Sequence, residues 1–326
     1  MLKTLPKSFF VKVGIILLLL TVIVQFFDVI ITKNIDSFFV EKFFPPTDEV
    51  FDSENSDFYF SAFSDTGTRT SIVDLIAENV KKSKDKFVLQ VGDMFRYRTL
   101  SHYRWMVSEV QDAFQTMPIY SIPGNHDIND KYGLQLYRSV FGQENYWFSY
   151  GNTLFVGINS SSISFSENTL DWLKRTLKRE RKYYQNCIIF THVPPLDPRK
   201  GYSYCLEKED SEHFYSAIKD FNISMIICGH VHHYGKLLFN GIPLVVLPAS
   251  GQKKRDCDWG FVRFHVSGQQ IEVDPTFFDQ PSRNREYVEA YINTYLSGSF
   301  RLFVLSGSFF FLSMIAFGIS FGKKKN

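Results

Sequence analysis

The chain has 326 residues, of which 21% are charged and 44% hydrophobic, and its formal net charge is +2. This balance excludes a disordered chain, and without a basic block in the central region no nucleic-acid partner is expected. Four cysteines are too few for a disulfide scaffold, and their spacing contains no paired zinc motif. Cys205 and Cys257 lie in polar segments, and whether they pair stays open.

Each end of the chain carries a long apolar run. Residues 13–27 are apolar apart from Gln25, and extension to Thr32 gives twenty residues. Residues 302–321 carry no charge and are followed by three lysines. Each run is long enough to cross the ~30 Å hydrocarbon core as a helix. No small-residue cleavage pattern follows the first run, which favours an uncleaved anchor over a signal peptide.

The lysines outside these runs predict the topology. The positive-inside rule places both ends in the cytoplasm and the middle of the chain on the other side of the membrane. That side is the periplasmic face of a bacterial inner membrane, or the endoplasmic reticulum lumen in a eukaryote. The predicted parts are a tail and anchor (1–33), a linker (34–56), a globular domain (57–280), a juxtamembrane helix (281–301) and a second transmembrane helix with a basic tail (302–326).

The globular domain begins with three apolar runs separated by helical patterns. Residues 58–63, 87–91 and 117–122 are predicted strands, and apolar residues recur at helical spacing between them. Carboxylate or amide side chains follow these strands, and they are Asp65, Asp93 and Asn125. Strands alternating with helices predict an α/β domain, with ligands at the carboxyl ends of its strands.

Two later apolar runs end in histidines. His192 follows residues 187–190, whereas His230 and His232 follow residues 225–228. The last two side chains should point the same way, because side chains alternate along an extended segment. Mixed oxygen and nitrogen donors suit Mn, Fe or Zn, whereas Mg and Ca prefer oxygen alone. The absence of cysteine at these strand ends argues against a structural zinc site.

Residues 124–127, Gly-Asn-His-Asp, place an amide, an imidazole and a carboxylate in consecutive positions after a strand. Taken alone, the tetrapeptide is also compatible with an Asx turn that carries a solvated histidine. The other strand ends, with their carboxylates and histidines, favour a metal site.

The ordered motifs resemble those of the calcineurin-like metallophosphoesterases over about residues 57–275. They are Asp65, Gly92-Asp93, Gly124-Asn125-His126-Asp127, His192 and Gly229-His230-Val231-His232. The resemblance implies a four-layer α-β-β-α sandwich with two divalent metal ions at the strand ends. It also implies an enzyme that hydrolyses a phosphoester, because two cations in such a site activate water and stabilise the leaving oxygen.

The resemblance further implies a role for each motif residue. Asp93 would bridge the two metal ions. Asn125, His192 and His230 would complete one site, whereas Asp65 and His232 would serve the other. His126, assisted by Asp127, would donate a proton to the leaving oxygen or stabilise the transition state.

Two positions depart from the family pattern. Gly67 stands where the first motif usually has histidine, and Arg96 stands where a branch similar to purple acid phosphatases has tyrosine. Tyr97 follows one residue later. The metal site at Asp65 is therefore expected either to lack one protein ligand or to use Tyr97.

The substrate is predicted only by location. Two membrane anchors would hold the site near a bilayer, which favours a lipid-linked or cell-envelope phosphoester, either a diester or a monoester. The C-terminal lysines also resemble a dilysine retrieval signal, as in the branch that removes ethanolamine phosphate from glycosylphosphatidylinositol anchors. Gly67 and Arg96 leave a third possibility, a membrane-anchored binding or sensing protein with weak catalysis.

Residues 253–255, which are basic, form either an anion-binding or a solvated loop, and Trp259 is expected in the core.

Overall fold

The structure is a computed structural model of the full chain. It describes residues 6–33, 50–51, 56–67, 69–98, 100–128, 132–251, 258–279 and 306–316. The chain divides into two compact units, one formed by residues 1–40 and 291–326 and the other by residues 41–290.

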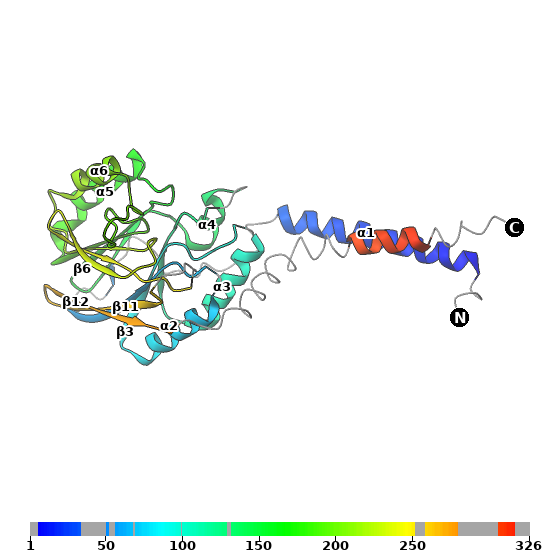
Figure 1. The fold of residues 1–326 in the computed structure, drawn as a ribbon, viewed down its shortest axis with the longest axis horizontal. Coiled ribbons are helices and arrows are strands. Elements are labelled where there is room, and N and C mark those ends of the chain that lie inside the picture. Colours follow the sequence, from blue (N-terminus) through cyan, green and yellow to red (C-terminus); the bar gives the residue numbers. More distant parts are fainter. Residues whose placement is uncertain are drawn as a thin grey trace. The chain divides into compact units, whose positions relative to one another are not determined.

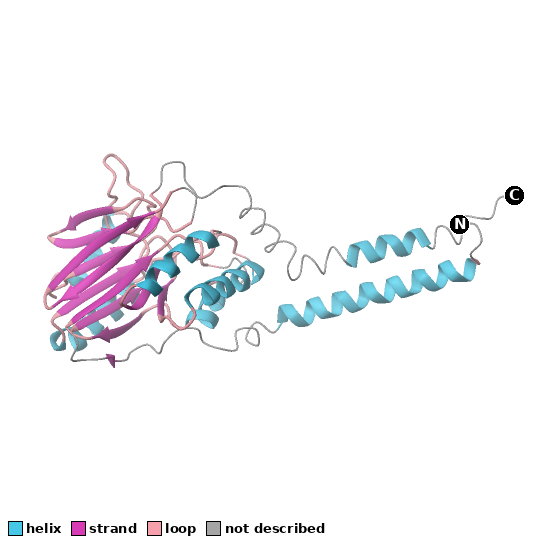
Figure 2. Cartoon of the chain, turned by 90° about the horizontal axis from the view of Figure 1, so that it is seen from below, coloured by secondary structure: helices cyan, strands magenta, loops and turns pink. Residues whose placement is uncertain are grey.

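The terminal unit contains helix α1 (Lys7–Lys33) and a helical segment at residues 306–316 (Figure 2). The two contact each other where the Thr21 hydroxyl donates a hydrogen bond of 3.5 Å to the Ser306 carbonyl. Within the described residues, no helix combines the length and the hydropathy that a membrane span requires.

The larger unit contains two β-sheets (Figures 1 and 2). The seven-stranded sheet has the order β1 (Val50–Phe51), β5 (Tyr146–Tyr150), β6 (Thr153–Ile158), β7 (Asn186–Thr191), β8 (Met225–Cys228), β10 (Ile242–Val246) and β9 (Gly235–Phe239). The five-stranded sheet has the order β12 (Gln270–Phe277), β11 (Gly260–Ser267), β2 (Asp57–Phe63), β3 (Asp85–Val91) and β4 (Ile119–Ile122).

Aromatic side chains fill the space between the sheets. Phe60 and Phe87 of the smaller sheet pack edge-to-face on Phe155 of the larger one, with ring centroids 5.2 Å apart in both pairs. These rings belong to one buried cluster drawn from both sheets. Burial of several such rings supplies much of the free energy that holds the two sheets together.

Helices cover the outer faces of both sheets. Among the described residues of this unit, the helices are α2 (Thr70–Lys82), α3 (Leu100–Phe114), α4 (Leu134–Phe141), α5 (Glu167–Glu180), the 3₁₀ turn η2 (Arg181–Tyr183) and α6 (Lys208–Ile218). A second buried cluster joins Leu173 of α5 and Phe214 of α6 to the larger sheet. The crossovers α2 and α3 connect parallel strands of the smaller sheet, whose other face is taken by the larger sheet. The order of layers is thus helix, sheet, sheet, helix, as expected.

The parallel strands of the two sheets end at a common edge. Strands β2, β3 and β4 are parallel, as are β6, β7, β8 and β10. The two sheets are tied there, because the Ser250 amide after β10 donates to the Ser64 carbonyl after β2 at 2.8 Å. Residues that follow these strands are consequently brought together from distant parts of the sequence.

Strand β1 was not expected from the sequence. Val50 and Phe51 lie in the predicted linker, yet they form the edge strand β1, parallel to β5. Two residues are too few to show the alternating pattern of a strand, so this pairing has no signal in the sequence. The predicted juxtamembrane helix, residues 281–301, lies outside the described residues.

Candidate metal centre

Four of the predicted ligands have a left-handed backbone. The φ angles are 55° for Asp65, 53° for Asp93, 71° for His230 and 63° for His232. L-residues rarely adopt this region, and such conformations persist only where the surrounding structure enforces them. The sharp turns after β2, β3 and β8 thus direct these side chains to one place at an energetic cost.

Two glycines allow the loops to approach closely. A Cβ on Gly124 would lie 2.2 Å from Asp93 Oδ1, and a Cβ on Gly92 would lie 2.4 Å from His192 Nδ1. Real Cβ atoms do not come so near to other heavy atoms. The glycines that precede Asp93 and Asn125 are therefore needed to seat Asp93 and His192.

Asp93, His192 and His230 form a buried cluster of three metal-ligating groups. Their ligand atoms all lie within 4.8 Å of one another. The Nε2 atom of His192 is 3.4 Å from Asp93 Oδ2 and 3.3 Å from His230 Nδ1. His192 Nδ1 donates to the Val91 carbonyl at 2.9 Å. This bond fixes the tautomer that leaves Nε2 available to a metal ion.

Asp65 and His232 form a neighbouring pair. His232 Nε2 lies 3.0 Å from Asp65 Oδ1, and both side chains are buried. The other carboxylate oxygen of Asp65 accepts hydrogen bonds from the His230 amide at 2.9 Å and the Ser64 hydroxyl at 2.6 Å. The Asp65 amide donates to the Gly92 carbonyl, directly before Asp93. The pair is thus joined by hydrogen bonds to the loops after β3 and β8, two of the three strands that supply the cluster.

The donor set fits a pair of divalent cations. Among the described residues, Asn125 Oδ1 and His232 Nδ1 are buried polar atoms without a hydrogen-bond partner. Such atoms are costly inside a protein unless something binds them. Carboxylate, amide and imidazole donors together suit Mn, Fe or Zn. The predicted ligands of both metal sites therefore meet at one edge of the sheets.

The electrostatics of the cluster favour a cation. Burial by itself would lower the pKa of His192. The Asp93 and Asp65 carboxylates together outweigh burial and raise that pKa to about 10. Burial lowers the pKa of His230 to about 3, with the charge of His192 acting in the same direction. Burial opposes ionisation of Asp93, yet His192 holds the pKa of Asp93 below its usual value. The carboxylates thus favour positive charge at the site, and a metal ion would supply it in place of the proton on His192.

His126 is the accessible ring of the site. Its amide donates to Asp93 Oδ1 at 2.7 Å, and its Nε2 lies 4.0 Å from Asp93 Oδ2. The side chain is 35% exposed, whereas that of His192 is completely buried. Burial lowers the pKa of His126 below its usual value. This ring can therefore exchange a proton with a bound molecule.

Asp127 contacts the backbone of the site. One carboxylate oxygen accepts from the amides of Asp93 and Gly124, each at 2.8 Å, and the other accepts from the Phe95 amide at 3.0 Å. Burial and the charge of Asp93 raise the pKa of Asp127 to about 8. These contacts are to backbone amides, and the predicted assistance to His126 stays a prediction. Asp127 is a positioning residue that connects the loops after β3 and β4.

A family model described as calcineurin-like phosphoesterase matches residues 58–234. The chain belongs to this family. Its two-sheet architecture with flanking helices agrees with that membership.

Curated relatives match part of the chain at low identity. A probable cyclic nucleotide phosphodiesterase of Moraxella catarrhalis is 24% identical over 163 residues, which are 44% of this chain and 57% of the relative. A 3′,5′-cyclic adenosine monophosphate phosphodiesterase of Haemophilus influenzae is 23% identical over 203 residues, 59% of this chain and 72% of the relative. A second probable cyclic nucleotide phosphodiesterase, from Colwellia psychrerythraea, is matched over 56% of its length. The chain thus spans little more than half of two of these relatives.

Solved structures share the fold. A dimetal phosphatase from Danio rerio superposes with a TM-score of 0.54 at 16% identity, covering 68% of this chain and 96% of that one. A purple acid phosphatase from yellow lupin gives a TM-score of 0.55 at 16% identity, covering 70% of this chain and 54% of that one. At this identity the likeness establishes the architecture alone.

A buried histidine, His102, lies next to Gly67, where this chain departs from the family pattern. Gly67 has φ 63°, and its carbonyl lies 3.3 Å from Nε2 of His102, which is completely buried on α3. The Arg96 amide donates to the same nitrogen at 3.2 Å. Burial lowers the pKa of His102 to about 4, so the ring is neutral. Tyr97 packs edge-on against it, with ring centroids 5.2 Å apart.

Tyr204 is a second residue that sequence reasoning missed. Its ring stacks on His230, with centroids 4.1 Å apart and an interplanar angle of 9°. The Tyr204 amide donates to Asp197 at 2.8 Å, and the Arg199 guanidinium donates two hydrogen bonds to the same carboxylate, at 2.9 and 2.7 Å. This loop between β7 and α6 therefore supports a predicted metal ligand. Nothing in its sequence indicates the contact, which depends on the fold.

The remaining sequence predictions have mixed outcomes. Trp259 is 6% exposed and lies in the core as expected, with the Arg69 guanidinium 5.0 Å from its ring centre. Cys205 is a free thiol, half-buried near the Tyr204 loop. Its possible partner Cys257 and the basic residues 253–255 lie outside the described residues.

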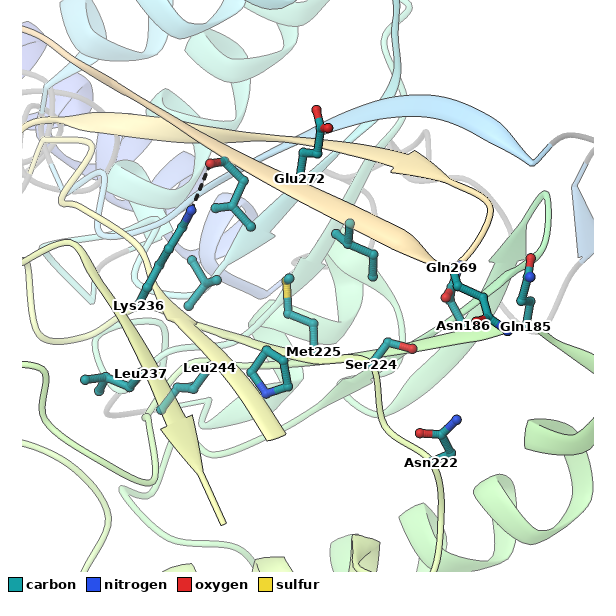
Figure 3. A pocket seen from close by; sticks show the side chains of 14 residues that line it. Gln185, Asn186, Asn222, Ser224, Met225, Lys236, Leu237, Leu244, Gln269 and Glu272 are labelled. Carbon is teal, nitrogen blue, oxygen red and sulfur yellow. Dashed lines mark hydrogen bonds between the residues drawn. The ribbon is translucent and has the colours of Figure 1, made fainter. Parts of the chain in front are cut away.

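Two cavities lie at opposite ends of the sheets. One, of about 550 Å³, borders the metal centre at Asn125. The other, of about 720 Å³, lies where β7 and β8 begin and is lined by Asn186, Met225 and Lys236 (Figure 3). The larger cavity is therefore at the end of the parallel strands that does not carry the predicted ligands.

Proposed function

We propose that this phosphoesterase hydrolyses a phosphodiester with the help of two divalent cations, drawn from Mn, Fe and Zn. The observation that carries the proposal is the convergence of Asp93, His192 and His230 within 4.8 Å, with the Asp65–His232 pair beside them. The names of the curated relatives support a diester rather than a monoester.

The proposal assigns each side chain a task. When bound, the two cations supply positive charge that activates water and stabilises the leaving oxygen. Asp93 would hold a cation together with His192 and His230, and the Val91 carbonyl orients His192 toward this cluster. His126 is held in place by the hydrogen bond from its backbone amide to the Asp93 carboxylate. Its ring would hold a proton for the leaving oxygen. Asp127 keeps the loops in register through the three amides that it binds.

The proposal is tested by hydrolysis of bis(4-nitrophenyl) phosphate and 4-nitrophenyl phosphate by the full chain. Activity should depend on added Mn²⁺, disappear with a chelator and be higher on the diester. The absence of turnover with every divalent cation would instead support a binding or sensing protein. Preference for the monoester would contradict the assignment as a phosphodiesterase.

We also propose that the enzyme acts at a membrane surface on a lipid-linked or cell-envelope phosphoester. The support is the sequence alone, in the apolar runs 13–32 and 302–321 and the lysines that flank them. Protease added to sealed vesicles that expose the non-cytoplasmic face should cut the central domain. Protection of that domain, with cleavage only after the vesicles are opened, would reverse the proposed orientation.

A further inference from the structure

The cavity of about 550 Å³ beside the metal centre has a mixed lining. It is bounded by the loops after β4 and β6, by the start of α4 and by Arg98. Three apolar side chains line it, from Ile128, Leu134 and Ile163. The polar lining residues are Arg98, Asn125, Asn159, Ser161 and Ser162. Such a lining fits an organic molecule that has an apolar body and a polar end.

Ile163 is held in an unusual conformation at this cavity. Its φ angle is 59°, and its side chain is 43% exposed. A β-branched residue in this backbone region is a genuine outlier. A single exposed apolar side chain is ordinary on a protein surface. An exposed apolar side chain on a strained backbone is unusual, and such strain is typical of functional sites.

The turn that carries Ile163 is fixed to the strand that supplies His192. The Ile163 amide donates to the Ser160 carbonyl at 2.9 Å. The Ser160 hydroxyl accepts from the Thr191 hydroxyl and the Val193 amide, each at 2.9 Å. The wall of the cavity and the metal ligand are thus parts of one hydrogen-bonded unit.

Arg98 connects the cavity to the reacting groups. Its Nη2 donates to the Asn125 carbonyl at 2.9 Å, and Asn125 directly precedes His126. The cavity therefore begins beside the ring that would protonate the leaving oxygen.

We propose that this cavity, the leaving-group pocket, receives the alcohol that the phosphodiester releases. The preferred alcohol has an apolar body, which Ile128, Leu134 and Ile163 would contact, and a polar or anionic group for Arg98. This proposal rests on the proposed phosphodiesterase activity.

The step balances as a hydrolysis. Water forms a new P–O bond and gives one proton to solvent, the ester P–O bond to the alcohol breaks, and His126 protonates the departing oxygen. The products are a phosphomonoester and the free alcohol that the pocket holds.

The test varies only the leaving group. Methyl 4-nitrophenyl phosphate and methyl 4-methylumbelliferyl phosphate share their non-leaving group, and their phenols have similar acidity but differ in size. The wild-type chain should have the higher kcat/KM on the larger, bicyclic ester. The ratio that is compared is kcat/KM for the methylumbelliferyl ester divided by kcat/KM for the nitrophenyl ester. Ile163→Asn should lower this ratio about threefold to tenfold, because apolar contact with the larger group is lost.

Two further variants make the test specific. Leu134→Ala should lower the ratio in the same direction, which provides a second measurement from a different element. Leu238→Asn is the matched control, because Leu238 is 67% exposed on β9 and does not line the pocket. It should leave the ratio unchanged. Ile163→Asn should not lower the Tm, since asparagine accepts a positive φ more readily than isoleucine.

An unchanged ratio in both Ile163→Asn and Leu134→Ala would overturn the leaving-group pocket while the phosphodiesterase activity stands. An equal change in Leu238→Asn would also overturn it, because the effect would not be local. If the wild-type chain hydrolyses neither ester with any divalent cation, the proposed function and the pocket fall together.

Discussion

The two ends of the sheets differ in how they use polar groups. Where the parallel strands end, four functional residues have positive φ angles and carboxylates lie buried beside imidazoles. Where β7 and β8 begin, the larger cavity has an ordinary backbone at every lining residue. Its polar groups are bonded, as in the bonds from Asn186 to the Gly268 carbonyl at 2.7 Å and from Lys236 to the Val273 carbonyl at 3.0 Å.

The difference shows that cavity size does not locate the chemistry of this protein. At the end with the larger cavity, the polar side chains form hydrogen bonds within the protein, so they need no ligand. The other end concentrates backbone strain, buried charge and buried polar atoms without a hydrogen-bond partner, which reduce stability unless something binds. Substitutions at the two ends should therefore have unlike effects.

The largest expected effect is on turnover. Asp93→Asn should lower kcat/KM on an aryl phosphodiester by about 10³-fold or more, because the carboxylate that joins the two groups of ligands is lost. Glu272→Gln at the other cavity is the matched carboxylate-to-amide change and should leave kcat/KM within about twofold. Comparable losses in both variants would remove the distinction between the two ends.

Gly124→Ala should disturb the centre through packing alone. The added methyl group would lie 2.2 Å from Asp93 Oδ1, which forces Asp93 to shift. We expect a loss of about 2 kcal/mol in the free energy of unfolding and of about 10²-fold in kcat/KM. The control Gly241→Ala has open space around the added carbon and a φ of 87°, so it should cost about 1 kcal/mol without an effect on kcat/KM. Wild-type turnover in Gly124→Ala would show that the close approach to Asp93 is not required.

Tyr204→Ala should weaken metal binding moderately, because the stacked ring restrains His230. Loss of one aromatic contact predicts a rise of about twofold to tenfold in the Kd for Mn²⁺, measured by calorimetry. Tyr204→Phe keeps the ring and should retain the wild-type Kd. Tyr202→Ala, at a 65% exposed position of the same loop, is the control. Equal losses in Tyr204→Phe and Tyr204→Ala would assign the effect to the hydroxyl instead.

The smallest effect concerns the largely exposed ion pair between His265 of β11 and Asp57 of β2. A hydrogen bond to Asp57 raises the pKa of His265 above its usual value, with Glu272 contributing in the same direction. The stabilisation is thus fully present below the unfolded pKa of about 6.5 and is lost as the pH rises through the higher folded pKa. Because the pair is largely exposed, His265→Gln should remove only about 0.5 kcal/mol, and only at low pH. Urea unfolding at pH 5.5 and 8.5 tests this, and a greater loss at the higher pH would contradict the sign.

The sequence predicted the parts of the centre that local order encodes. Asp65, Asp93, Asn125 and the histidines follow buried strands, and the ends of parallel strands must meet. His102 could not be recognised, because it sits among apolar helix positions and contacts Gly67 only after folding. Tyr204 was missed for a similar reason, since its partner His230 is far along the chain.

The role of Asp127 shows a different limit. Its place in the Gly-Asn-His-Asp motif suggested a partner for the adjacent histidine, yet its oxygens bind the amides of Asp93, Phe95 and Gly124. Side-chain direction at a tight turn depends on backbone angles that residue order does not specify. The identity of a metal-ligating set can therefore be predicted from the sequence more readily than the contacts that support it.

The most direct test of the central claim is the number of metal ions bound by the full chain. After equilibrium dialysis against Mn²⁺, elemental analysis should find two ions per chain, as expected if Asp65, Asp93, Asn125, His192, His230 and His232 hold a pair of cations. One ion or none at saturation would contradict the account.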